Sequence, residues 1–121
     1  MDVYEVDAHM RELTPHQTKI LEALYHVGAD WASRAQIARA IGKRRLTPYD
    51  INILSMLARR GFVEVSTRPT TAPGSEFAYV YRMPDDVAAA LQHWADLRAQ
   101  IREERRMSRR PINLQEARHD Y

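Results

Sequence analysis

Apolar positions recur at a helical period in three successive segments of the first half of the chain. In each segment the apolar side chains are three or four residues apart, which places them on one face of a helix. The expected inward-facing stripes are Ile20, Leu21, Leu24 and Val27 in the first segment, Ile37, Ala38 and Ile41 in the second, and Ile51, Leu54, Leu57 and Ala58 in the third. The pattern therefore predicts three amphipathic helices around one core.

Each of these segments begins with the same start signal. A Ser or Thr precedes the helix as an N-cap, because its hydroxyl accepts a hydrogen bond from a backbone N–H of the first turn. A polar residue three positions later completes a capping box. The pairs are Thr14 with Gln17, Ser33 with Gln36, and Thr47 with Asp50. Gly28, Gly42 and Gly61 follow the three segments and predict where the helices end.

The pattern changes from helix to strand after Gly61. "FVEVS" and "FAYVYRM" are β-branched and aromatic, and the second alternates, as strands do. The intervening "TRPTTAPGSE" holds two Pro and one Gly and reads as a loop. These residues predict a β-hairpin with a long tip. Between the first two helices, "ADW" is long enough only for a single strand-like bridge.

A long helix follows Pro84, because no Gly or Pro interrupts the chain from there to Pro111. Its apolar residues alternate spacings of three and four, which makes a seam. The seam can pack on the chain's own first helix or on a second copy. We expect a homodimer, because the helix overhangs so small a domain and each large side chain buried contributes about 1.5–3 kcal/mol. The predicted dimer interface consists of Val87, Ala90, Leu91, Trp94, Leu97 and Ile101.

The order helix, short strand, helix, turn, helix, hairpin resembles a winged helix-turn-helix. "SRAQIARAIG" is similar to the support helix of such domains, and "TPYDINILSMLARRGFVEV" is similar to their recognition helix. The resemblance covers about Leu13–Arg82, and it is to small MarR-type transcriptional regulators. The hairpin departs from that type, whose tip usually carries an Asp and an Arg. Here the tip carries Arg68 and two Pro but no Asp.

The expected fold class is mainly α with a small β-hairpin (α+β): a winged helix-turn-helix plus a long C-terminal helix. We expect an acidic N-terminal arm at 1–12 and the winged domain at 13–83. A dimerisation helix at 84–110 and a tail at 111–121 complete the chain. A chain of 121 residues fits one such domain with an appendage.

Charge is concentrated in the middle of the chain. The formal net charge is only +2, but the segment Gly28–Arg68 holds eight cations against three acids, which gives it a charge of +5. A local basic excess of this kind is typical of a surface that binds phosphates. It is equally compatible with a solvated, arginine-rich surface, so the interpretation depends on the resemblance.

The resemblance implies that the third helix enters the major groove of double-stranded DNA. If its stripe faces inward as expected, Tyr49, Asn52 and Ile53 face outward, so that Asn52 can bind an adenine edge and Ile53 a thymine methyl. Basic residues before the helix and the start of the second helix then meet phosphates. Arg68 is placed near the minor groove. The candidate DNA-binding residues are Ser33, Arg34, Lys43, Arg44, Arg45, Thr47, Tyr49, Asn52, Ile53 and Arg68.

The sequence offers no pattern for catalysis. It has no Cys, its five His are dispersed, and its four Gly stand singly, so thiolate chemistry, metal-ligand spacing and phosphate-binding loops are missing. We expect no enzyme activity, no metal and no cofactor. The acidic N-terminus is unlike a signal peptide, and no apolar run reaches the roughly 20 residues of a membrane span. We therefore expect a soluble, cytoplasmic protein.

Two functions remain at this stage. The first is a dimeric, sequence-specific transcriptional regulator whose two recognition helices lie about one DNA turn apart. The second is a winged-helix module within a larger assembly that binds another protein through Ile53, Met56 and the long helix, without sequence-specific DNA contact. The basic run from Lys43 to Arg45 favours the first. The operator, the regulated genes and any small-molecule effector are not encoded in a readable way.

Overall fold

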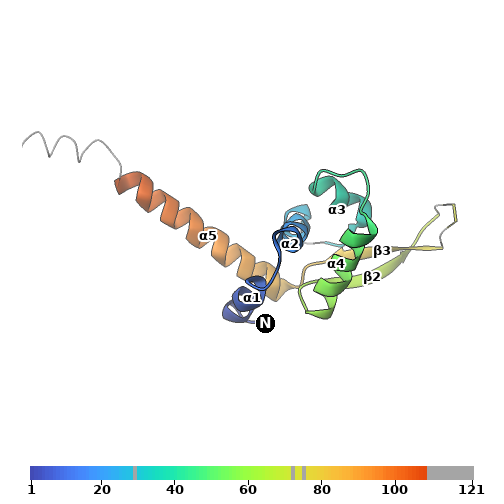
Figure 1. The fold of residues 1–121 in the computed structure, drawn as a ribbon, viewed down its shortest axis with the longest axis horizontal. Helices are drawn as coiled ribbons and strands as arrows, with labels where there is room; N and C mark the ends of the chain where they lie inside the picture. Colours follow the sequence, from blue (N-terminus) through green and yellow to red (C-terminus); the bar gives the residue numbers. More distant parts are fainter. Residues whose placement is uncertain (29, 72, 75, 109–121) are drawn as a thin grey trace, which may run out of the picture. The chain divides into compact units, whose positions relative to one another are not determined.

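The computed structural model describes residues 1–28, 30–71, 73–74 and 76–108, which fall into two compact units, one ending at Ala90 and the other starting at Leu91. The elements of the first unit are α1 (Val3–Met10), α2 (Pro15–Val27), β1 (Ala32–Ser33), α3 (Arg34–Ala40), α4 (Pro48–Arg59), β2 (Glu64–Pro69) and β3 (Phe77–Arg82) (Figure 1). Helix α5 (Asp85–Ser108) begins in this unit and supplies the described part of the second. From α2 onward, the predicted order of helices and strands is confirmed.

The three predicted helix starts are all formed by complete capping boxes. In the first, the Gln17 backbone N–H donates to Thr14 Oγ1 at 3.2 Å and the Thr14 N–H donates to Gln17 Oε1 at 3.0 Å. Ser33 and Thr47 make the same pair of bonds at α3 and α4. Gly61 follows α4 with a φ of 84°, a left-handed conformation that glycine adopts without strain. Local sequence therefore determines where these helices begin and end.

The hairpin belongs to a three-stranded antiparallel sheet with the order β1-β3-β2. β2 pairs with β3 along its whole length, from Glu64 opposite Arg82 to Pro69 opposite Phe77. The strand-like bridge expected within "ADW" (29–31) lies just after that stretch, as β1 at Ala32–Ser33, and Ser33 lies opposite Val80. Because Ser33 also caps α3, the sheet is joined directly to the start of that helix.

The core of the first unit lies among α2, α3, α4 and the base of the hairpin. Its fully buried side chains include Ile20, Leu21, Leu24, Ile37, Leu54, Leu57 and Phe62. Residues 1–12, expected as an acidic arm, contain helix α1, which is capped by Asp2 and buries Val6. The amine of Met1 forms an ion pair with Asp86. The N-terminal residues are thus part of the first unit.

The buried face of α4 is shifted by about one residue around the helix from the predicted face, so the predicted orientation was wrong. Ile53 is only 3% exposed, whereas Ile51, expected inside, is half-buried. The buried face is instead Asp50, Ile53, Leu54 and Leu57, again at helical spacing. The sequence prediction chose the stripe from apolar residues alone, and a polar residue such as Asp50 gave no reason to be counted in the buried face. Asp50 is nevertheless completely buried, since other groups satisfy its charge.

The predicted seam of α5 is divided by burial. Val87 and Ala90 are completely buried in the chain and Leu91 is 9% exposed, so these three offer little surface to a partner. Their prediction as dimer contacts is wrong for the conformation described. Leu97 and Ile101, further along the helix, are exposed at 36% and 40%. Most of the stability of a helix in a protein comes from packing of its apolar face. The exposed part of this stripe therefore remains the candidate for contact with a second copy.

Candidate nucleic-acid interface

One face of α4 is open to solvent and carries polar side chains. Tyr49 is 60% exposed in the first turn, and Asn52, Ser55 and Arg59 are exposed at successive helical spacings beyond it. Of the residues predicted for this face, Tyr49 and Asn52 lie there and Ile53 does not. Ser55 and Arg59 were not among the sequence candidates. The helical period could have indicated both residues, because Ser55 lies three positions after Asn52 and Arg59 lies four positions after Ser55.

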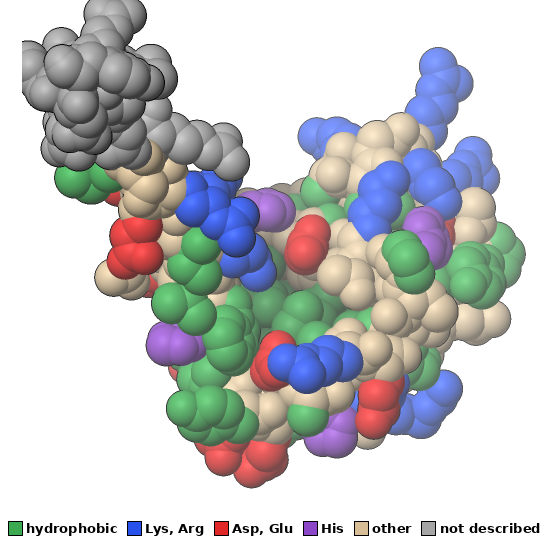
Figure 2. Space-filling model, turned by 60° about the vertical axis from the view of Figure 1, so that its left-hand side comes forward, with side chains coloured by type: hydrophobic (Ala, Val, Ile, Leu, Met, Phe, Trp, Pro, Cys, Tyr) green, Lys and Arg blue, Asp and Glu red, His purple; other side chains and the backbone are tan. Residues whose placement is uncertain are grey.

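The turn between α3 and α4 supplies exposed positive charge. Arg44 and Arg45 are exposed in this turn, and Arg39 is exposed on the preceding helix. In the space-filling view, Lys and Arg side chains gather at the upper right, over α3 and the turn that follows it (Figure 2). Thr47 is also exposed, but its hydroxyl is used as the α4 cap. Of the three consecutive cations Lys43, Arg44 and Arg45, the two arginines make no contact with a carboxylate among the described residues.

The third cation, Lys43, is held by a buried carboxylate. Its Nζ lies 2.9 Å from Asp50 Oδ2, and the Thr47 backbone N–H donates to the same oxygen at 2.9 Å. His16 Nε2, from α2, lies 2.8 Å from Asp50 Oδ1. Burial raises the pKa of Asp50, but the hydrogen bonds from His16, Lys43 and Thr47 outweigh it and hold that pKa well below its ordinary value. The carboxylate is therefore ionised and joins α2, the turn and α4.

His16 also contacts the exposed face of α4. Its ring stacks on Tyr49 with the centroids 5.8 Å apart and the planes 14° from parallel. Sequence spacing does not single out this His, because its partners are 33 and 34 residues away along the chain. The structure makes it a neighbour of the predicted DNA-facing side chain.

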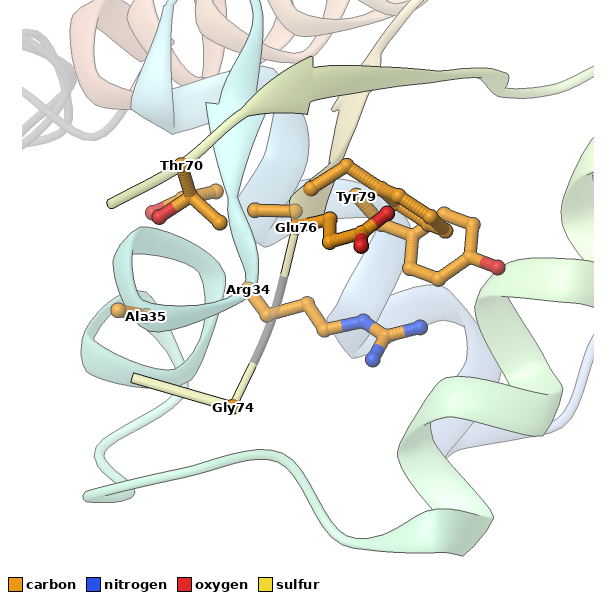
Figure 3. A pocket seen from close by; sticks show the side chains of 9 residues that line it. Arg34, Ala35, Thr70, Gly74, Glu76 and Tyr79 are labelled. Carbon is orange, nitrogen blue, oxygen red and sulfur yellow. The ribbon is translucent and has the colours of Figure 1, made fainter. Parts of the chain in front are cut away.

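Arg34 is engaged with the hairpin. Its Nε donates to the Tyr81 hydroxyl at 3.1 Å, and its guanidinium lies 4.6 Å over the ring of Tyr79, as Figure 3 shows for Arg34 and Tyr79. Arg34 and Tyr79 line a shallow hollow of about 840 Å³ with Glu76 and Phe77. Arg34 thus braces the hairpin against the start of α3, and one face of its guanidinium is covered by Tyr79.

Arg68 lies on the opposite face of the hairpin, beside an aromatic residue. Its guanidinium is 5.8 Å from the ring of Trp31, and that of Arg82 is 5.0 Å from the same ring. Arg82 also forms an ion pair with Glu64 at 2.6 Å. Arg68 is exposed, but its ring contact holds it along the strand. Residues 72 and 75 of the expected tip lie outside the described residues, so the minor-groove position predicted for Arg68 stays a prediction.

Two further classes of site are missing from the described ranges. No group of three or more His, Asp or Glu side chains there has the proximity needed to hold a metal ion. Across the same ranges, no helix combines the length and apolarity needed to span a membrane.

Neither a family model nor a curated protein matches the chain. Solved structures do. The fold is a winged helix-turn-helix. A protein described as a possible transcriptional regulator from Methanosarcina mazei Go1 superposes with a TM-score of 0.51 at 15% identity, over 84% of this chain and 87% of that one. A point mutant of MepR from a multidrug-resistant S. aureus clinical isolate superposes with a TM-score of 0.57 at 14% identity, over 96% and 81% of the two chains.

These likenesses confirm the predicted resemblance to MarR-type winged-helix proteins at the level of the fold. In such a fold, α3 and α4 are the two helices of the helix-turn-helix, and β2 with β3 forms the wing.

Proposed function

We propose that the chain is a transcriptional regulator that binds double-stranded DNA sequence-specifically as a homodimer. The recognition helix α4 enters the major groove, and the wing lies near the adjacent minor groove. The observation that carries the proposal is the combination of an exposed polar face on α4, with Tyr49 and Asn52, and the exposed Arg44 and Arg45 directly before it. The description of the Methanosarcina mazei protein as a possible transcriptional regulator supports the same class of function.

The two sets of residues have separate tasks. Arg44 and Arg45 meet backbone phosphates and set affinity without reading sequence. Asn52 and Ser55, on the exposed face, reach base edges, and Asn52 has the donor and acceptor pair that matches adenine. Lys43 contributes to the site by holding the Asp50 carboxylate. The Lys43 side chain is still partly exposed, so it lies at the edge of the proposed phosphate-binding surface.

The alternative of a protein-binding module loses the support that it drew from α4. That interpretation used Ile53 and Met56 as an apolar patch on the exposed face of α4, together with the long helix. Ile53 is buried and Met56 is half-buried, so the patch is not formed. The exposed face of α4 is polar, which favours nucleic acid.

Dimerisation is proposed through the exposed part of the α5 stripe. Leu97 and Ile101 are one helical turn apart and exposed, and the half-buried Trp94 lies three residues before Leu97. Pairing two such helices removes these side chains from water, which contributes about 1.5–3 kcal/mol for each one fully buried. A two-fold axis then relates two recognition helices and predicts a pseudo-palindromic site.

A salt titration of binding to mixed genomic duplexes tests the proposal. Each phosphate contact contributes about 0.9 to the slope of log K against log salt, so replacing Arg44 and Arg45 with Ala in both protomers should lower the slope by about 3–4. The matched control is Arg11→Ala with Arg60→Ala, because both of these arginines pair with carboxylates of the chain. Equal slopes for the two double variants, or no duplex binding by the wild type, would remove the proposed function.

A further inference from the structure

We infer that the wing carries a site for an unpaired base of a single-stranded nucleic acid, at the hollow between the hairpin and the start of α3. The base stacks on exposed aromatic rings of β3, and Arg34 binds a neighbouring phosphate of the same strand. The inference goes beyond the proposed function, because a base inside a duplex is stacked between its neighbours and is not available to a ring of the protein.

Three exposed apolar side chains of the wing share one face of the hairpin. Phe77, Val65 and Tyr79 are exposed at 51%, 42% and 41%. In the register of the two strands, Val65 lies opposite Tyr81 and Thr67 lies opposite Tyr79. Residues that lie opposite one another, or two apart on one strand, point to the same face. Phe77 and Tyr79 therefore form an adjacent pair of rings, with centroids 5.8 Å apart and planes at 84°.

Arg34 is held against these rings by two contacts. Its Nε donates to the Tyr81 hydroxyl at 3.1 Å, and its guanidinium carbon lies 4.6 Å from the centre of the Tyr79 ring. None of the ion pairs among the described residues involves Arg34, so no carboxylate there compensates its charge. A guanidinium that is already fixed in this way loses little freedom when it binds a phosphate.

A shallow hollow of about 840 Å³ brings these groups together. Its lining includes Arg34, Phe77 and Tyr79, with Glu76 beside them, as Figure 3 shows for Arg34, Glu76 and Tyr79. Sites for small molecules enclose most of the ligand surface, which a shallow hollow does not do. A nucleic-acid strand needs no enclosure, because each stacked base and each phosphate contact adds to its binding. The shape of the hollow therefore favours a strand over a free small molecule.

Glu76 gives this hollow a preference among bases. An ionised carboxylate only accepts hydrogen bonds, and none of the ion pairs among the described residues engages Glu76. The exocyclic amino group of cytosine is a donor, whereas thymine carries an oxygen at the same position. A cytosine in the hollow therefore fits beside Glu76 better than a thymine does.

The first test measures binding of a labelled single strand of about 12 deoxycytidines by fluorescence anisotropy, a length within the usual site sizes. The wild type should bind this strand. Phe77→Leu with Tyr79→Leu keeps apolar side chains but removes both rings, so it should weaken binding by roughly 5- to 150-fold for each stacked base lost. Tyr79→Phe keeps the ring and should bind as the wild type does. Val65→Ala is the matched control, because Val65 lies on the same face but does not line the hollow.

The second test compares strands of deoxycytidine and deoxythymidine of equal length. The wild type should bind the deoxycytidine strand more tightly, and Glu76→Gln should reduce this difference, because an amide offers a donor as well as an acceptor to the base. Equal affinities of the wild type for the two strands would overturn the placement of the base beside Glu76.

Further outcomes separate this inference from the proposed function. A wild type that binds no single strand, or a double Leu variant that binds as tightly as the wild type, overturns the inference and leaves duplex binding to its own test. Competition by free cytidine monophosphate at an equal concentration of nucleotides overturns it as well, because the hollow is then a small-molecule site. Single-strand binding that the double Leu variant loses, in a wild type that binds no duplex, supports the inference while the proposed function fails.

Discussion

The Nζ of Lys43 lies 2.9 Å from Oδ2 of Asp50, a carboxylate that is completely buried. This contact joins the turn after α3 to the first turn of α4. His16 reaches the other oxygen from α2, so three segments meet at one charge. The acid that the sequence identifies as a capping residue is thus also the anchor of the helix-turn-helix.

Removing this anchor is expected to destabilise the fold. Asp50→Ala should lower the free energy of unfolding by about 2–3 kcal/mol, somewhat less than for a fully buried ion pair because Lys43 keeps access to water. Urea denaturation followed by circular dichroism measures the loss. Glu12→Ala, which breaks an exposed pair with Arg60, should cost less than about 1 kcal/mol. Similar losses for the two variants would show that Asp50 is not an anchor.

The same carboxylate gives a pH dependence with a definite sign. The pKa of Asp50 in the folded chain is lowered from its ordinary value of 3.8, so the unfolded chain takes up this proton first as the pH falls. The contribution of Asp50 to stability is therefore complete well above pH 3.8 and is lost as the pH drops below it toward the folded pKa. The stability difference between wild type and Asp50→Asn should shrink in urea titrations below that pH. A difference that grows on acidification contradicts the assignment.

The corrected orientation of α4 predicts that Ile53 acts in the core. Ile53→Ala should cost about 2–4 kcal/mol of unfolding free energy, the usual range for a large aliphatic side chain removed from a core. Asn52→Ala, its exposed neighbour, should change stability by no more than about 0.5 kcal/mol. Urea denaturation of both variants checks this. If Ile53→Ala were neutral for stability and weakened DNA binding, the original outward orientation would be restored.

The sequence was sufficient for features that depend on neighbouring residues. The capping boxes at Thr14, Ser33 and Thr47 and the helix-ending Gly61 need only a few consecutive residues, and all were predicted correctly. The hairpin followed from alternation in the same way. The resemblance then ordered these elements into the correct fold.

Features that depend on distant residues were not predictable in this way. Asp50 is buried because His16, 34 residues earlier, completes its hydrogen bonds, and without that partner its polarity argues for exposure. Arg34 donates to the Tyr81 hydroxyl, 47 residues later, and this contact with the wing was likewise not predicted. Both contacts have one physical cause, since a charged side chain can be compensated by a partner that sequence spacing does not reveal.

The exposed part of α5 predicts how the chain associates. Leu97→Glu with Ile101→Glu should convert a dimer to a monomer, because it places four carboxylates at the proposed contact of two helices. Size-exclusion chromatography with light scattering measures the mass. Gln100→Glu, at an exposed position between them, is the control and should leave the mass unchanged. A wild type of single-chain mass, or a double variant that stays dimeric, rules out this interface.

The most direct test of the DNA-binding proposal is selection of duplexes from a random pool by the wild type and by Asn52→Ala, followed by sequencing. The wild type should enrich two inverted half-sites with centres about 10 base pairs apart, as two recognition helices of a dimer require. Asn52→Ala should relax the preference at one base pair of each half-site and leave the others in place. No enrichment by the wild type, or an unchanged preference in Asn52→Ala, would contradict the proposal that this face of α4 reads DNA.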